Sequence, residues 1–327
     1  MNFLTKNTTA LAVVTTISIP GLAFAEAEIF GKAHLSFGSL SEDDGITDVS
    51  STAVTSHASR VGIKGSFDTD SDTSVIYRFV WQIDMTDEGK SSNDHIKSRE
   101  QYVGLKGDWG QVRIGRDDSP YKKAGKKNVE HLSDTYADYN NIIDKGQDTR
   151  NDNSLGYWNK IGPGKLGIQY ASGDDDPSAE NAGQSFSLAY DMKVGAFGFA
   201  AAHQTIEKSA TNDETGIKLV LGYRLGDTQL GLIGETVEDD NTLDDTNLLF
   251  SIKHNLDKNN AIKFVYGTKD QGNTDDATMT ALAYDHKMGK KVSVYALWSD
   301  GADNGMNDAS KLSGDSSAIA LGVIAKF

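Results

Sequence analysis

The sequence of 327 residues predicts an all-β fold, a 16-stranded antiparallel transmembrane β-barrel. Three observations lead to this prediction. Apolar and polar residues alternate with a period of two along most of the chain, about sixteen segments show the alternation, and the connections between them are short and long in turn. Short turns at one end and long loops at the other are typical of an up-and-down barrel that crosses a membrane.

The first 25 residues are a predicted secretory signal peptide. Lys6 precedes an apolar run over 10–19, and Ala23, Phe24 and Ala25 supply an A-x-A cleavage site. The apolar run is too short to cross ~30 Å of hydrocarbon as a helix, which argues against a membrane anchor. We therefore expect two segments, a signal peptide over residues 1–25 and a barrel over residues 26–327 that leaves the cytoplasm.

Each predicted strand has one apolar and one polar face. The clearest is SVIYRFVWQIDM, residues 74–85, in which every second residue from Val75 to Ile83 is apolar. Successive side chains of a strand point to opposite faces, so one set can face lipid while the other faces a wet lumen. A mean hydropathy of −0.45 is thus compatible with a membrane barrel. In chain order, further apolar sets are Ile29, Ala33, Leu35 and Phe37; Val61, Ile63 and Phe67; Leu166, Ile168 and Tyr170; Ile217, Leu219, Leu221 and Tyr223; Ile262, Phe264 and Tyr266; and Ile319, Leu321, Val323, Ala325 and Phe327.

One connection between strands is much longer than the others. More than thirty residues separate the strand that ends near Gly115 from the strand that begins near Arg150. A long segment without clear periodicity is usually functional, and a barrel of this size has a wide lumen unless something enters it. We expect this third loop to fold inward. The other predicted connections are short turns at 107–110, 160–165, 225–228 and 287–291 and long loops at 41–58, 172–184, 204–215, 237–246 and 299–316.

Composition and motifs argue against several other classes of protein. A formal net charge of −15 disfavours nucleic-acid binding, which needs clustered Lys and Arg. The absence of Cys excludes disulfides and thiol nucleophiles, and no nucleophile elbow or zinc-hydrolase motif occurs. GPGKLG (162–167) has no following helix, and the segment from Asp68 lacks the Gly and Glu of a calcium loop. We expect no enzyme activity, cofactor or metal; carboxylate-rich loops are most simply solvated surface.

Several sequence motifs, in their order and spacing, resemble those of the general Gram-negative bacterial porins. They are IFGKAHLSFG in the first strand, SRVGIKGSF in the second, SREQYVGLKGDWGQVRIGR across the fourth and fifth, and the terminal ALGVIAKF. The resemblance covers the whole mature chain. It implies a 16-stranded barrel in the outer membrane of a Gram-negative bacterium, a homotrimer, and a third loop that narrows the pore to an eyelet.

The resemblance also implies opposed charges at that eyelet. The loop lacks the Pro-Glu-Phe-Gly-Gly run of the enterobacterial members, so its shape is expected to differ. The alternation by itself points Lys32 and Arg60 into the lumen, whereas Arg99 shares parity with Val103 and Leu105. Either a bulge intervenes there or that strand faces the trimer interface. By resemblance, the basic wall is Lys32, Arg60, Lys97, Arg99 and Arg150, and the acidic loop residues are Glu130, Asp134 and Asp138.

Two further roles follow from the resemblance. Arg116 has the outward parity of a lipid-facing residue, and in porins this position pairs across the trimer interface, here with Glu88 or Asp87. Phe327, the terminal aromatic residue, is the expected recognition signal for the outer-membrane barrel assembly machinery. By pattern alone, it ends a closing strand that pairs with the first strand near Ile29 and leaves no open sheet edge.

The resulting prediction is a porin for passive diffusion of ions and small hydrophilic solutes. The acidic loops favour a weak preference for cations. Outer-membrane lipid and lipopolysaccharide are the expected surroundings, and no nucleic-acid partner is expected. The alternatives are a substrate-specific channel for a sugar or other nutrient, a structural or adhesin barrel with a plugged lumen, and a secreted soluble β protein.

Overall fold

The structure is a computed structural model that describes residues 27–86, 95–143, 146–173, 183–209, 212–239, 245–270 and 275–327. The predicted signal peptide lies outside the described residues. No helix in these ranges is long and apolar enough to cross a membrane. The strands are β1 (Glu28–Asp43), β2 (Asp48–Ser56), β3 (Arg60–Asp68), β4 (Ser74–Ile83), β5 (Ile96–Gly107), β6 (Gly110–Asp118), β7 (Arg150–Ile161), β8 (Gly164–Ala171), β9 (Ser185–Val194), β10 (Phe197–Ser209), β11 (Asn212–Leu225), β12 (Thr228–Asp239), β13 (Asp245–Asn255), β14 (Asn260–Lys269), β15 (Ala277–Lys287), β16 (Val292–Ala302) and β17 (Asp315–Lys326).

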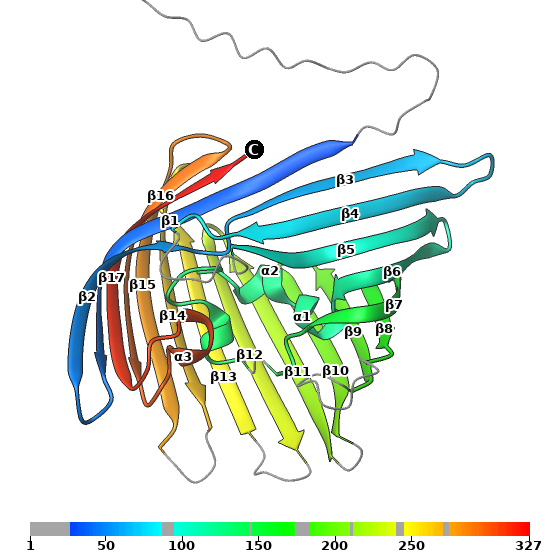
Figure 1. Ribbon diagram of the computed structural model, residues 1–327. Helices are drawn as coiled ribbons and strands as arrows, with labels where there is room; N and C mark the ends of the chain where they lie inside the picture. Colours follow the sequence, from blue (N-terminus) through cyan, green and yellow to red (C-terminus); the bar gives the residue numbers. More distant parts are fainter. Residues whose placement is uncertain are drawn as a thin grey trace, which may run out of the picture.

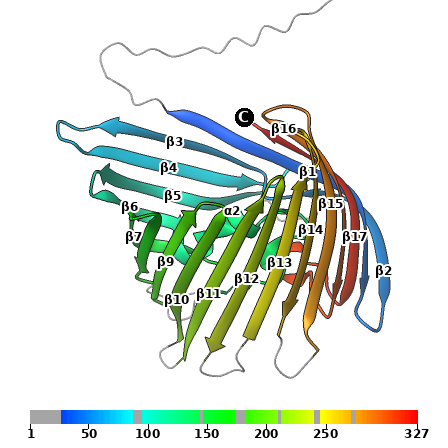
Figure 2. The same cartoon turned by 180° about the vertical axis from the view of Figure 1, so that it is seen from behind.

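These strands form one closed antiparallel sheet (Figures 1 and 2). Each strand pairs with its neighbours in the sequence, and β17 closes the barrel by pairing with β1 from Lys32–Lys326 to Glu42–Ser316. Closure pairs the backbone groups of the first and last strands, which a sheet in hydrocarbon requires. The predicted barrel and the predicted pairing of the last strand with the first are both confirmed.

The second barrel strand is interrupted. Both β2 and β3 pair with β1, β2 along its second half and β3 along its first, so together they fill one position. Ala58, between them, has a positive φ of 46°. The seventeen strand segments thus occupy sixteen positions around the barrel, as predicted.

The two faces of the sheet follow the predicted alternation. In β17, Ile319 and Leu321 are 64% and 65% exposed, whereas Ala318 and Ala320 are 1% and 2% exposed. Large apolar side chains therefore point outward. Small, polar and some large apolar side chains, among them Val220, Ile233 and Leu249, point into the barrel, where other segments cover them.

A bulge in β5 accounts for the parity of Arg99, for which the sequence left open either a bulge or a strand at the trimer interface. Phe79 pairs with Gln101, but Trp81 pairs with Ser98, so one extra residue of β5 lies between the two pairs. An extra residue reverses the facing of everything before it. Lys97 then pairs with the inward-facing Gln82, on the side of the lumen.

Two predicted long loops are largely strand. Residues 41–58 contain the end of β1 and all of β2, and residues 204–215 contain the ends of β10 and β11. These ends are rich in Ser, Thr, Asp and Glu on both faces. An apolar period cannot reveal a strand that continues where neither face is apolar.

The segment between β6 and β7 lies against the inward face of the barrel. It contains α1 (Pro120–Lys123), α2 (Lys126–Val129) and the 3₁₀ turn η1 (Tyr139–Asn141) (Figure 1). Tyr121 donates its backbone N–H to Ser187 Oγ of β9 at 3.0 Å. Gly125 has a φ of +66°, and a Cβ there would lie 2.5 Å from Val220 of β11, so the chain can approach the wall only as glycine.

A second connection contacts this segment. Between β16 and β17, α3 (Asn307–Ser310) packs against η1. Ser310 donates its backbone N–H to Asn141 Oδ1 at 3.1 Å and its hydroxyl to the Tyr136 carbonyl at 2.5 Å. Met306, just before α3, is fully buried. The last connection therefore helps to hold the segment between β6 and β7.

Candidate functional site

Lys32 and Arg60 meet one carboxylate inside the barrel. They are direct cross-strand partners on β1 and β3, an arrangement in which two like charges repel. Asp134, from the segment between β6 and β7, forms an ion pair with Lys32 and lies 3.5 Å from Arg60 Nη1. The carboxylate thus compensates both charges and ties the segment to the wall.

Local backbone structure holds Asp134 in this position. Its φ is +54°, a conformation that Asp tolerates better than most residues, and its N–H donates to Asp138 Oδ2 at 2.5 Å. Burial raises the pKa of the Asp134 carboxyl, but the positive charges of Lys32, Arg60 and Arg99 outweigh burial and hold the pKa at about 2. Asp134 is therefore ionised throughout the physiological pH range.

The other predicted basic residues have separate partners. Arg99 donates to Gln82 Oε1 at 2.7 Å, and its charge still acts on Asp134. Arg150 Nη2 lies 2.8 Å from Asp118 Oδ1 at the junction of β6 and β7. Lys97 is exposed, on the lumenal side of the bulge. Lys32, Arg60 and Arg99 thus form the central basic group around Asp134, and Arg150, whose charge acts on Arg99, lies beside it.

The other two predicted acids serve their own loop. Asp138 accepts from the N–H groups of Asn140 and Asp134, which caps η1, and its side chain is buried. Glu130 lies 3.9 Å from Lys126 in the same segment. Burial raises the pKa of Glu130 to about 7, since the charges of Asp138 and Asp134 add to burial and only Lys126 strongly opposes it. Of the three predicted acids, Asp134 is the one that forms ion pairs with the wall.

A buried carboxylate that the sequence did not single out anchors the segment. Asp148 lies 3.0 Å from Lys122 Nζ and 3.5 Å from both Lys126 Nζ and Lys218 Nζ of β11. It also accepts a hydrogen bond of 2.7 Å from the Tyr139 hydroxyl. Burial disfavours the charged form, but the three ammonium groups hold the pKa of Asp148 well below its usual range. The polar parity of Lys218 in an apolar strand was the only sequence signal for this contact.

A second buried polar group lies beside Lys32 and Asp134. His34 Nε2 is 2.9 Å from the Tyr295 hydroxyl, and Ser36 Oγ is 2.7 Å from His57 Nε2. The His57 ring packs edge-on against Tyr136 of the inner segment, with 4.9 Å between ring centroids. These contacts join the wall to the inner segment near the interruption between β2 and β3.

The predicted interface residues are only partly described. Arg116 forms an ion pair with Asp152 of β7 in the same chain. Asp87 and Glu88, its predicted partners from a neighbouring subunit, lie outside the described residues. A bulge in the β6–β7 pairing brings Asp152 to Arg116, and the sequence did not reveal this bulge. Arg116 therefore has an acidic partner without a second subunit.

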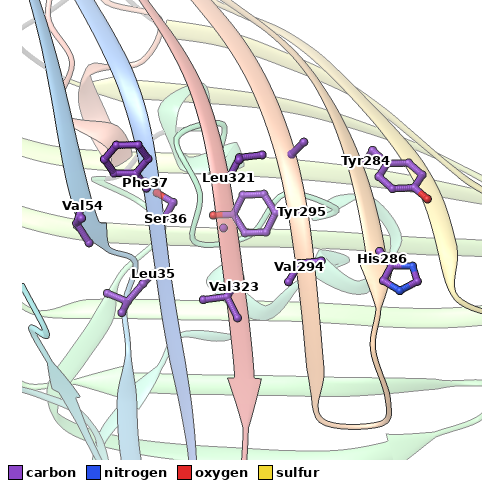
Figure 3. A pocket seen from close by; sticks show the side chains of 12 residues that line it. Leu35, Ser36, Phe37, Val54, Tyr284, His286, Val294, Tyr295, Leu321 and Val323 are labelled. Atoms are coloured by element: carbon purple, nitrogen blue, oxygen red, sulfur yellow. The ribbon is translucent and has the colours of Figure 1, made fainter.

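The outer face of the barrel has an apolar depression of about 580 Å³ (Figure 3). It spans β1, β2 and β15 to β17, with Leu35, Phe37, Leu321 and Val323 around it. Phe37 and Leu321 are 59% and 65% exposed. This depression therefore belongs to the outer apolar surface and not to the charged interior.

The interior chemistry is that of charge and hydrogen bonding. Among the described residues, no group of three His, Asp or Glu side chains is arranged to hold a metal ion. Fixed cations on β1, β3 and β5 and carboxylates on the inner segment can attract, repel and orient solutes. They can also determine which sizes and charges pass between the segment and the wall.

Comparison with known proteins gives concordant results. The sequence model of the family described as "Gram-negative porin" matches residues 8–298. "Major outer membrane protein P.IB" of Neisseria meningitidis is 24% identical over 226 residues, which are 65% of this chain and 66% of that protein. The matched part is thus just under two thirds of the length of these relatives.

Solved structures share the fold. The "Anion-selective porin from Comamonas acidovorans" superposes with a TM-score of 0.77 at 16% identity, covering 93% of this chain and all of that one. Salmonella typhi OmpF, in a complex with daunomycin, gives a TM-score of 0.73 at 15% identity, with 93% and 98% of the two chains covered. At these identities the superpositions show a common architecture.

Proposed function

The chain belongs to the Gram-negative porin family, and from this premise we propose that it is an outer-membrane channel for passive diffusion of ions and small hydrophilic solutes. The closed sheet supports this, because its outer face carries the exposed large apolar side chains and its inner face carries the buried polar and charged ones. Solutes cross down their gradients, and no covalent chemistry is involved. The absence of catalytic activity is part of the same proposal.

The contact of Asp134 with Lys32 and Arg60 is the observation that carries the proposal. It joins the inner segment to the wall, so the remaining aqueous passage is narrower than the barrel. In this proposal the basic wall is Lys32, Arg60, Lys97, Arg99 and Arg150, and the acidic loop residues are Glu130, Asp134 and Asp138. Asp134 sets the position of the segment, and the wall cations set the local field.

The charges at this constriction favour anions. Asp134 compensates two bases, and Arg99 contributes a third positive charge nearby. The structural neighbour from Comamonas acidovorans is described as anion-selective, which agrees with this inference. The net charge of −15 predicts the opposite, a weak preference for cations. We propose anion preference, because the field at the narrowest point acts on permeating ions more strongly than the loops do.

The assembly and its partners belong to the same proposal. A homotrimer in outer-membrane lipid and lipopolysaccharide is the family arrangement, and one structural neighbour is described as a trimer form. Arg116 is proposed to face the interface, in contact with Asp152 and with Asp87 or Glu88 of a neighbouring subunit. Phe327 is proposed to be read by the barrel assembly machinery.

Planar-bilayer recording of the purified protein tests this function. We expect stepwise conductance in KCl and, in a KCl gradient, a reversal potential of the sign given by Cl⁻ permeation. No conductance would contradict the channel, whereas a reversal potential of the opposite sign would contradict only the anion preference.

A further inference from the structure

Three cations form one row across the inner wall, on strands other than those that carry the central basic group. Arg224 of β11 pairs with Gln229 of β12, Gln229 pairs with Lys253 of β13, and Lys253 pairs with Lys263 of β14. All four side chains have the inward parity of buried neighbours such as Val220 and Val265. We call Arg224, Lys253 and Lys263 the inner cation row.

The inner cation row occupies a defined place in the barrel. It lies near the short turns at 225–228 and 255–260, at the end opposite to the long loops (Figure 1). The strands that carry it are across the barrel from β1, β3 and β5, which carry the central basic group. A solute that passes Lys32 and Arg60 therefore meets further cations on the opposite wall.

The row is only partly compensated by acids. Lys253 and Lys263 are directly opposed like charges, which destabilise a sheet unless something lies between them. Lys263 Nζ has an ion pair of 2.5 Å with Asp285 of β15. Within the described ranges, no acidic side chain forms an ion pair with Arg224 or Lys253. Two cations beside one compensated cation leave a site of net positive charge.

A histidine of the inner segment, His131, lies near this row, because Val129, two residues before it, lies 2.6 Å from the place of a Cβ at Gly231 of β12. The positive charges of Lys253 and Lys263 reach His131; burial first, and then these charges, lower the pKa of His131 to about 4. The imidazole is therefore neutral at physiological pH and adds no further repulsion. Its Nε2 is buried and has no hydrogen-bond partner among the residues that the structure describes. A buried unpaired ring nitrogen marks a place where a ligand or water is expected.

We propose that the inner cation row, with His131, binds small oxyanions such as phosphate or dicarboxylates at the short-turn end of the channel. Two ammonium groups and a guanidinium match the charge and the acceptor oxygens of a dianion, and the neutral imidazole supplies a donor. The bound anion occupies the place of the acid that Lys253 lacks. This inference rests on the proposed channel function and adds a binding station that the constriction does not include.

Chloride current with added inorganic phosphate tests the proposal. The variant Arg224→Gln/Lys253→Gln removes two cations of the row and leaves the pair of Lys263 with Asp285 intact. The control Lys258→Gln/Lys290→Gln removes two exposed lysines from the adjacent turns, with the same change of net charge. We expect phosphate to reduce the chloride current of wild type and control at similar concentrations. The row variant should need an about tenfold higher phosphate concentration for the same reduction of the current, because two charge contacts with phosphate are lost.

Three outcomes would overturn the proposal. Phosphate could fail to reduce the chloride current of a conducting wild type, or could reduce the currents of the row variant and the control equally. Loss of the phosphate effect in Lys32→Gln would assign phosphate binding to the constriction. The same measurement with succinate in place of phosphate shows whether the site binds dicarboxylates as well as phosphate. Absence of chloride current in every protein would instead refute the channel function itself.

Discussion

Asp134 shows how a single residue connects the inner segment with the wall. Its carboxylate contacts Lys32 and Arg60, which would otherwise repel each other across one strand pair. The parity of these two cations could be predicted from the sequence, because both lie in strands with a clean apolar face. The parity of Arg99 could not, since the β5 bulge leaves no mark in the apolar pattern.

Neutralising Asp134 is expected to increase the preference for anions. Asp134→Asn leaves Lys32 and Arg60 uncompensated, so the positive field at the constriction rises and the segment loses an ion pair. The ratio of Cl⁻ to K⁺ permeability should rise severalfold, as measured from reversal potentials. Asp70→Asn, in an exposed turn, is the matched control and should leave the ratio unchanged. An unchanged ratio in Asp134→Asn would mean that ions pass at a distance from this carboxylate.

Selectivity should also depend on pH through Glu130. Its pKa is raised to about 7, so Glu130 is largely protonated at pH 5 and largely ionised at pH 9. Ionisation adds one negative charge to the inner segment, and anion preference should therefore fall as the pH rises through 7. The reversal potential measured from pH 5 to pH 9 checks this, and Glu130→Gln should abolish the step.

The same shift has a consequence for stability. Because the pKa of Glu130 in the folded chain is above that of a free glutamate, the folded state binds the proton more tightly. The stabilisation is complete below the ordinary glutamate pKa and is lost as the pH rises through about 7. Asp134, with a lowered pKa, acts in the opposite sense and stabilises the fold until the pH falls toward 2.

At the scale of elements, the segment between β6 and β7 is held by charge as well as by apolar packing. Ile142 and Ile143 are fully buried, as the apolar core of the segment requires. Asp148 then joins Lys122 and Lys126 of the segment to Lys218 of the wall. The length of the segment predicted its importance, but these partners are distant in sequence, and only the folded barrel brings them together.

Removing the Asp148 charge is expected to loosen the segment. Asp148→Asn leaves the half-buried Lys122 and Lys126 and the buried Lys218 around a neutral side chain, and breaking a buried ion pair in this way costs about 3 kcal/mol. We expect a lower unfolding temperature and a larger, noisier single-channel conductance. Thermal unfolding in detergent and bilayer recording measure the two effects. Asp70→Asn, again the control, should change neither, and wild-type conductance in Asp148→Asn would show that other contacts suffice.

At the scale of the whole molecule, the strand count, closure and facing of side chains could be predicted from the sequence. Alternation of apolar and polar residues shows which face of the sheet a side chain lies on, wherever one face contacts lipid. This alternation continues through β1 and β17, where the barrel closes. The extent of the strands beyond the membrane could not be predicted, because Ser, Thr and Asp occupy both faces there. The net charge of −15 predicts a weak preference for cations, whereas the basic residues near Lys32 and Lys253 underlie the proposed preference for anions, and the reversal potential decides between the two.

Closure of the barrel separates two possible roles of Phe327. Its backbone exchanges two hydrogen bonds with Gly31, N–H to carbonyl at 3.2 Å and 3.0 Å, at the end of a seam that pairs eleven further positions. Its ring is 57% exposed on the outer surface and rests over Gly31, where a Cβ would lie 2.3 Å from the ring. Deleting Phe327 removes two peripheral hydrogen bonds, each worth about 1 kcal/mol, and therefore weakens an assembled barrel only slightly.

If the assembly machinery recognises Phe327, its deletion should reduce the amount of protein inserted in the outer membrane far more than it lowers the unfolding temperature of refolded protein. Phe327→Tyr, which keeps a terminal aromatic ring, is the control for the loss of the side chain. Equal insertion of the truncated chain in cells, quantified in outer-membrane fractions against wild type, would leave Phe327 with a closing role alone.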